Sequence, residues 1–270
     1  MRTKLNAQFK DSVTGQVSHS SPTSWLRTAI VNGFIGTSAN LQATTLCLLD
    51  NTGAKKDCAP ISWGSVTSST NSATISGTAT IKATSGYTVG GYAIYNNDTT
   101  PQQMFSSTIS TTYSVVTNQQ VTVNATLSAS QSSSSFSSSA GGTATINVTN
   151  LLTTLISLMT SGITVGTSTT YNANVLVPSA MSFYSGTTWT ASGSTQVFSQ
   201  TGLGASNVSA DTTNFKDTIT VSIAPANAFT FQSCYLDLTA GPKLIGVESI
   251  STAQSVPSGV TSTITIVLQW

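Results

Sequence analysis

Two stretches of this chain match each other without a gap, and each carries the alternation of a β-strand. Residues 109–127 read ISTTYSVVTNQQVTVNATL, and residues 250–268 read ISTAQSVPSGVTSTITIVL. Their alternating apolar positions coincide, as Val123 with Ile264, Ala125 with Ile266 and Leu127 with Leu268. Successive side chains of a strand point to opposite faces, so a match that stays in phase keeps the same face buried. The match predicts that one closing strand pair ends each of two copies of a β-domain.

Upstream segments extend the repeat. Residues 78–97 resemble residues 218–238, each reading as a strand, a turn and a second strand. Residues 23–34 and 149–162 each read as a short helix that ends near a glycine. Their apolar stripes are Trp25, Leu26, Ala29 and Ile30 in the first, and Leu151, Leu152, Leu155, Ile156 and Met159 in the second. Threonine and isoleucine also favour strands, so a strand is the alternative for both segments.

The repeat predicts an all-β protein of two tandem antiparallel β-sandwich domains, produced by internal duplication, each with one short helix. Residues 1–22 are predicted to be a polar N-terminal arm, residues 23–130 the first sandwich and residues 143–270 the second. Between them, residues 131–142 (QSSSSFSSSAGG) have the composition of a flexible linker. A long loop inside one continuous sandwich is the alternative for that segment.

The charge of the chain excludes several function classes. Only 6% of the residues are charged and the net charge is +1, whereas 39% are hydrophobic. Nucleic-acid binding needs a field of Lys and Arg, so it is not expected. With so few ionisable groups, folding is expected to be nearly indifferent to pH. This composition is typical of a structural β-protein exposed to the exterior.

The composition suggests a protein exposed to the exterior, but the sequence shows no signal for export. The start, MRTKLNAQFKDSV, has no apolar segment of a signal peptide, and no stretch approaches the roughly 20 apolar residues of a membrane-spanning helix. A virion component, assembled in the host cytoplasm and then released, resolves the conflict. A start that has replaced a signal peptide resolves it as well.

Three cysteines are present. Cys47 and Cys58 flank the turn-rich segment DNTGAKKD, so they are candidates for a disulfide across a hairpin. The alternative is that both are buried thiols in strands. Cys234 is predicted to be a buried free thiol.

No catalytic, cofactor or metal site is predicted. The single histidine, His19, has no acid or cysteine patterned around it and is expected to be solvated. Two pairs of aspartates bracket turns and are calcium candidates, Asp50 with Asp57 and Asp211 with Asp217. Turn formation explains these aspartates without a metal, and it is the preferred interpretation.

Two further kinds of surface site are candidates. Asn97 and Asn207 lie in Asn-x-Ser/Thr sequences within predicted loops, and they are candidate glycosylation sites. Four large aromatic residues are candidates for sugar stacking: Trp63, Trp189, Tyr95 and Trp270. Aromatic residues of a β-sandwich more commonly belong to the core or to an interface, which is the alternative.

The element order and the charge-poor, Thr/Ser/Asn-rich character resemble exterior virion proteins of archaeal viruses and tailed phages, such as capsid, turret, tail-fibre and spike β-domains. The resemblance implies a structural role and self-association, with other virion proteins as partners, no membrane insertion and no enzymatic activity. The last strand, TSTITIVLQW, is the predicted interface. Its candidate contact residues are Ile264, Ile266, Leu268 and Trp270.

A cell-surface adhesin, a filament subunit or a carbohydrate-binding module is the alternative function. Either class allows a glycan on a host surface as a partner.

Overall fold

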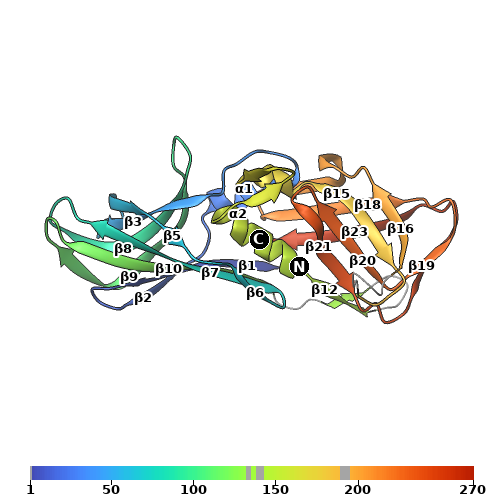
Figure 1. The fold of residues 1–270 in the computed structure, drawn as a ribbon, viewed down its shortest axis with the longest axis horizontal. Coiled ribbons are helices and arrows are strands. Elements are labelled where there is room, and N and C mark those ends of the chain that lie inside the picture. The colour runs from blue at the N-terminus through green and yellow to red at the C-terminus, as the bar shows by residue number, and fades with distance from the viewer. Residues whose placement is uncertain (1, 132–134, 138–142, 189–194) are drawn as a thin grey trace.

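The computed structural model describes residues 2–131, 135–137, 143–188 and 195–270. It is an elongated, sandwich-like all-β structure, with the two halves of the chain at opposite ends and the helices α1 (Ser24–Phe34) and α2 (Thr149–Met159) between them (Figure 1). Both termini of the described chain lie near this junction. Residues far apart in the sequence therefore meet at the middle of the molecule.

Two antiparallel sheets form the first half. We call them sheet I, with strand order β2-β1-β10-β7-β5 and β6 beside β7, and sheet II, with order β4-β3-β8-β9. The strands of sheet I are β1 (Thr3–Asp11), β2 (Val17–Ser20), β5 (Ser62–Trp63), β6 (Thr67–Ser69), β7 (Ser72–Lys82) and β10 (Gln120–Gln131). Those of sheet II are β3 (Ala43–Asp50), β4 (Lys55–Pro60), β8 (Tyr87–Asn96) and β9 (Gln103–Val115). Phe9 of sheet I meets Tyr92 of sheet II across the core, with ring centroids 5.8 Å apart.

The second half has two main sheets as well. Sheet III has the order β11-β12-β21-β20-β15-β16, and sheet IV has the order β17-β18-β23. Their strands are β11 (Ser135–Ser137), β12 (Thr143–Asn147), β15 (Pro178–Tyr184), β16 (Gln196–Thr201), β17 (Val208–Asp211), β18 (Lys216–Ile223), β20 (Ser233–Leu238), β21 (Gly241–Glu248) and β23 (Ser262–Gln269). Two small pairs complete it, β13 (Ile163–Val165) with β14 (Ser168–Thr170), and β19 (Phe229–Phe231) with β22 (Gln254–Val256). Two short 3-10 helices, η1 (Ala173–Leu176) and η2 (Ala205–Asn207), lie in its loops.

The same strand order and register recur in the two halves. Sheet II (β4-β3-β8-β9) has its counterpart in the β16-β15-β20-β21 part of sheet III. The repeated stretch also keeps its partners, because Val115 pairs with Tyr87 and Val256 pairs with Phe229. Likewise Val123 pairs with Ala79, and Ile264 pairs with Val221. An internal duplication remains our prediction for the origin of this recurrence.

The repeated stretch does not form a closing strand pair, so that prediction is wrong. Strand β9 lies in sheet II and β10 lies in sheet I, and in the second half β22 pairs with β19 whereas β23 pairs with β18. Strands β7 and β8 are likewise divided between sheets I and II. Apolar residues alternate along both strands, and this alternation is expected for two strands paired in a hairpin and for two strands in different sheets. The sequence pattern therefore did not distinguish a hairpin from a connection between sheets.

Both predicted helices are present, with corrections at their ends. Thr23 is the N-cap of α1, and its Oγ1 accepts a hydrogen bond from Leu26 N at 3.3 Å. Gly33 lies inside α1 rather than after it. A Cβ at Gly33 would lie 2.5 Å from Ala173 O, so glycine allows α1 to approach η1 closely.

Each helix packs against the half of the chain to which it does not belong. α1, from the first half, contacts η1, β17 and β18 as well as β9. α2, from the second half, contacts β6, β7 and β10 as well as β21. The apolar stripe of α2 is fully buried there. The two halves therefore share one hydrophobic core across their junction.

The predicted N-terminal arm is wrong for most of its length. β1 is an interior strand of sheet I that pairs with β10 over residues 3–11 and with β2 over residues 7–10. Its inward side chains Leu5, Ala7 and Phe9 are buried. The short alternation KLNAQF is thus a strand signal that outweighs the polar composition around it.

The predicted linker is described only in part. Residues 135–137 form β11, which pairs with β12, and Gln131 ends β10. The remainder of the predicted linker, residues 132–134 and 138–142, lies outside the described residues, as does Trp189.

A disulfide joins Cys47 of β3 to Cys58 of β4, whose Cα atoms are 4.0 Å apart. The two residues are direct cross-strand partners. It ties the edge strand β4 to the interior of sheet II. Cys234 is a buried free thiol, and burial raises its pKa to about 12.

The second half holds a serine pair at the place of this disulfide. Ser182 of β15 pairs with Ser199 of β16, as Cys47 pairs with Cys58. We expect Ser182→Cys/Ser199→Cys to form a second disulfide and to raise the free energy of unfolding by about 3 kcal/mol. Thiol counting under denaturing conditions and urea unfolding measure both effects. Free thiols at both new positions would contradict the equivalence of the two strand pairs, and the single variant Ser182→Cys is the control.

Candidate functional site

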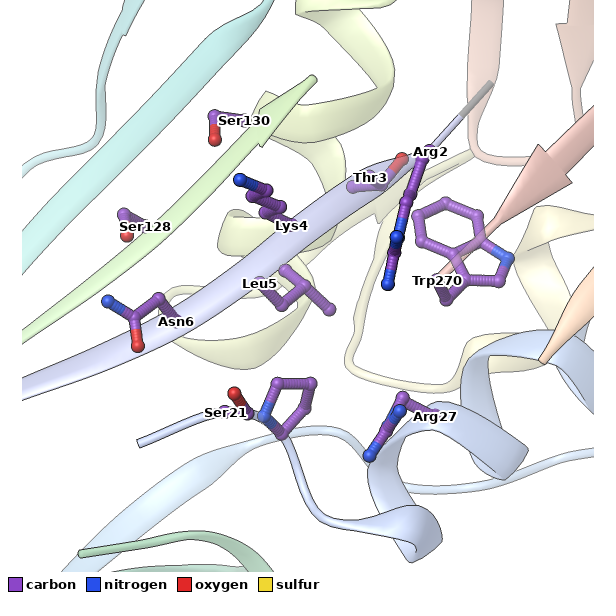
Figure 2. A pocket seen from close by; sticks show the side chains of 11 residues that line it. Arg2, Thr3, Lys4, Leu5, Asn6, Ser21, Arg27, Ser128, Ser130 and Trp270 are labelled. Atoms are coloured by element: carbon purple, nitrogen blue, oxygen red, sulfur yellow. The ribbon is translucent and has the colours of Figure 1, made fainter. Parts of the chain in front are cut away.

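A pocket of about 450 Å³ lies at the junction of the two halves (Figure 2). Its lining comes from the start of β1, the entry to α1, the end of β10 and the last residue, Trp270. β1 has no strand partner beside β10 over residues 4–6 in the described chain, because β2 pairs only from Ala7 onward. The pocket occupies this open edge of β1. The lining residues are Arg2, Thr3, Lys4, Leu5, Asn6, Ser21, Pro22, Arg27, Ser128, Ser130 and Trp270.

The lining is basic. It contains three of the nine Lys and Arg residues, Arg2, Lys4 and Arg27, and no Asp or Glu. The ion pair between Lys56 and Asp50 lies elsewhere, on strands β4 and β3. Arg27 lies over the ring of Phe215, with Cζ 4.4 Å from the ring centroid. Its buried Nε has no hydrogen-bond partner among the described residues. The pocket therefore offers positive charge that no Asp or Glu side chain of its lining neutralises.

Trp270 forms one wall of the pocket. Its indole packs on Phe34 of α1, with ring centroids 5.8 Å apart, and is 8% exposed. Figure 2 shows Arg2 beside this indole, and Arg27 across the pocket on α1. Because the ring faces are covered, Trp270 shapes the pocket rather than serving as an open stacking surface.

A buried carboxyl group accepts a hydrogen bond from the Trp270 indole. Asp217 of β18 is 0% exposed, and its Oδ2 accepts a hydrogen bond from Trp270 Nε1 at 3.0 Å. Its Oδ1 is buried without a partner among the described residues. Burial raises the pKa of Asp217 to about 7, which the bond from Trp270 opposes only in part. The expectation that folding is nearly indifferent to pH is therefore wrong at this residue.

The other candidate acids serve local structure. Asp50 accepts hydrogen bonds from Thr52 and Ala54, and Asp211 from Thr213 and Asn214, as turn-forming aspartates do. Asp57 accepts from Thr84 instead of facing Asp50. Within the described ranges, no group of three or more metal-ligating side chains is gathered.

Asp11, the last residue of β1, is the second buried carboxyl. Burial alone would raise its pKa, but hydrogen bonds from Thr14, Tyr92 and Val13 outweigh burial and lower it. The sequence did not single out this residue. Only the fold brings the Tyr92 hydroxyl within 2.8 Å of it.

The structure separates the remaining candidates. His19 is exposed on β2 opposite Gln8. Trp63 donates from Nε1 to Ala43 O, and Tyr95 lies under Lys55, so these aromatic residues do not form a common platform with Trp270. Asn97 is exposed in the turn after β8.

Asn207 is less accessible to modification than Asn97. Both ends of its amide are used, since Oδ1 accepts from Gly204 N and Nδ2 donates to Thr220 O. A glycan on Asn207 would leave Nδ2 with a single hydrogen, which would have to keep its bond to Thr220 O beside the sugar.

The side chains predicted to form an apolar interface point inward. Ile266, Leu268 and Trp270 are buried in the protein's own core, and Ile264 is half-buried. The prediction of an apolar contact through these side chains is wrong, because the in-phase alternation that identified the strand directs them to the core. The part of β23 that these side chains leave exposed is the backbone edge of the strand.

No family model, curated protein or solved structure matches this chain. Neither helix in the described part of the chain has the length and apolar character that crossing a membrane requires.

Sequence reasoning missed the pocket. It included Arg2 and Lys4 only in the polar arm of residues 1–22, and it used Trp25 and Leu26 of α1 without remarking on Arg27. The site joins the first residues, the first helix and the last residue, and no spacing in the sequence reveals such a meeting.

Proposed function

We propose that this protein is an exterior structural protein of a virion, as a shell or appendage component, and that it acts by self-association. In this proposal it is assembled in the host cytoplasm, becomes extracellular with the particle and has no catalytic role. The charge-poor hydroxyl-rich surface, the disulfide and the shared core of the two halves support a robust building block.

The edge of β23 is the observation that carries the proposal. In the first half, β10 has β7 on one side and β1 on the other. Its counterpart β23 has β18 on one side, and on the other side Gln269 bridges to Arg2. The edge from Ser262 to Ile266 thus lacks a described counterpart of β1. It also carries no charge or proline, the features that usually protect a strand edge.

We infer that two copies pair their β23 edges. Strand pairing between copies supplies main-chain hydrogen bonds without requiring exposed apolar side chains. This mode agrees with the inward direction of Ile266 and Leu268.

Two single substitutions test this pairing. Thr265 on β23 and Thr220 on β18 are direct partners and both are exposed, so a lysine at either adds the same charge to the same face. We expect Thr265→Lys to weaken self-association roughly tenfold, about 1.4 kcal/mol, and Thr220→Lys to leave it nearly unchanged. Sedimentation velocity over a concentration series measures both. A wild-type protein that stays monomeric, or two variants with equal effects, would contradict the proposal.

A surface binding module is the second candidate function, as an adhesin or carbohydrate-binding module. The basic pocket at the junction favours it. Recovery of the chain in many copies from purified particles supports the virion proposal, whereas a processed precursor in a cell envelope supports the binding module.

A further inference from the structure

We infer that the outer face of sheet I, together with the junction pocket, binds an acidic polysaccharide. This inference concerns a different surface from the β23 edge and does not depend on self-association. The shared chemistry of the ligand is a chain of sugar units that carries carboxylate or sulfate groups.

The outer face of sheet I is polar and bears positive charge only. Its charged residues on β1 and β7 are Lys4, Lys10 and Lys82, and the face carries no acid in the described strands. Asp11, the one acid of β1, is buried on the inner side. In a chain with net charge +1, this face is distinguished by charges of one sign. Charge complementarity therefore selects an anionic partner.

The positive groups lie in a line that begins at the pocket. Lys4 lines the pocket, and Lys10 lies six residues further along β1, about 20 Å away at the rise of a strand. Lys10 of β1 is the cross-strand partner of Asn124 on β10, and Asn124 is in turn the partner of Thr78 on β7. Lys82 lies four residues after Thr78 on β7. This places Lys82 about 16 Å beyond Lys10. A ligand that contacts all of them must be extended and must carry several anionic groups.

Hydroxyl and amide groups fill the space between the lysines. Cross-strand hydrogen bonds join them in three pairs, Ser76 with Thr126, Thr78 with Asn124 and Thr80 with Thr122. A hydroxyl in such a pair still has bonding capacity, because it has one donor and two lone pairs. A flat row of this kind suits the hydroxyl groups of a saccharide.

The pocket suits one acidic sugar unit at the end of the line. Arg2, Lys4 and Arg27 line it together with no Asp or Glu side chain, and Arg27 Nε has no described partner. Its volume of about 450 Å³ is that of a small-molecule site. Ser128, Ser130 and Asn6 supply groups for sugar hydroxyls. A nucleotide base is less suited, because the indole faces of Trp270 are covered.

The test compares polygalacturonate, dextran sulfate and neutral dextran as ligands of the full chain, by isothermal calorimetry at low salt. We expect one or both acidic polymers to bind and neutral dextran not to bind, with the two acidic arms separating carboxylate from sulfate recognition. Raising the salt should weaken binding, because exposed charges are screened.

Charge-matched variants locate the surface. Lys4→Gln/Lys10→Gln removes two positive charges from the face, and Lys55→Gln/Lys216→Gln removes two from elsewhere. We expect the first pair to weaken binding roughly tenfold, at about twofold to fivefold for each cation, and the second pair to change it less than twofold. Thermal unfolding of all variants checks that each is folded.

Three results would overturn the inference: no binding to either acidic polymer, equal losses in the two double variants, or equal binding of single-stranded DNA. The last result would identify a general polyanion surface. Each outcome is independent of the oligomeric state, so a failed β23 test and a failed saccharide test are distinguishable.

Discussion

At pH 8, the Asp217→Asn variant is expected to be more stable than the wild type, by up to about 4 kcal/mol. A carboxyl group in the unfolded chain has a pKa of about 3.9, whereas burial raises that of folded Asp217 to about 7. The folded state therefore holds its proton to higher pH than the unfolded state. The free energy of unfolding is highest near pH 4, falls as the pH rises toward 7 and then levels off. Each pKa unit corresponds to about 1.4 kcal/mol.

Urea unfolding at several values between pH 5 and pH 8 measures this slope. The Asn side chain can keep the hydrogen bond from Trp270 Nε1 but does not ionise, so the slope of the variant should be close to zero. Asp211→Asn is the matched control in the same β17–β18 hairpin. Its carboxyl has a lowered pKa, because the Asn214 side chain bonds to it, and is ionised in both states above pH 5. Equal slopes for wild type and Asp217→Asn would contradict the assignment.

The unfolding measurements should not extend below about pH 5, because protonation of other acids lowers the free energy of unfolding there. Asp11 has a lowered pKa in the folded state, so its stabilising contribution is present above about pH 4 and is lost as the pH falls further. The two buried carboxyls together predict a maximum of stability on the acidic side of neutrality.

Asn71→Ala is expected to lower the free energy of unfolding by about 3–5 kcal/mol. Asn71 lies in the β6–β7 turn with φ of 53° and is 8% exposed. Its Oδ1 accepts from Val148 N at 2.9 Å, and its Nδ2 donates to Ile146 O at 3.1 Å. Val148 is the N-cap of α2 and has no side-chain cap of its own, so the first half supplies the missing contact. Alanine leaves two buried backbone groups unpaired, at about 1–3 kcal/mol each, and adds the strain of positive φ.

Asn118→Ala separates these two costs. Asn118 also has a positive φ, of 70°, but is exposed in the β9–β10 turn. It should show the conformational cost alone, about 1–2 kcal/mol. Guanidinium unfolding measures both variants. If Asn71→Ala costs no more than Asn118→Ala, the side-chain bonds do not hold the halves together.

The sequence contained enough information for the elements but not for their partners. Alternation at Val123, Ala125 and Leu127 predicted a strand with a buried face, and all three are buried. Spacing in residues 149–162 predicted α2 and its apolar stripe. Both signals are local, since each depends on the direction of neighbouring side chains along one element.

Sheet membership and the pocket depend on contacts between distant residues. The same alternation serves a hairpin and a connection between sheets, so β9 and β10 were wrongly expected to pair. Nothing in Lys4, Arg27 or Trp270 alone shows that they meet, because their meeting requires β1 to lie beside β10 and α1 to lie against the second half. Asp217 illustrates the same limit, since its burial follows from its place opposite Leu268 and under Trp270.

The crossed packing of the helices also sets an order for folding during synthesis. The inner face of β7 and β10 is complete only when α2 has packed on it, and α2 ends at Met159. α1 packs on η1, β17 and β18. These elements follow α2 in the sequence, so they are synthesised later still. A nascent chain that has passed residue 131 therefore has all the strands of its first sandwich but an uncovered apolar surface. We expect the first half to become resistant to protease only after much of the second half has emerged.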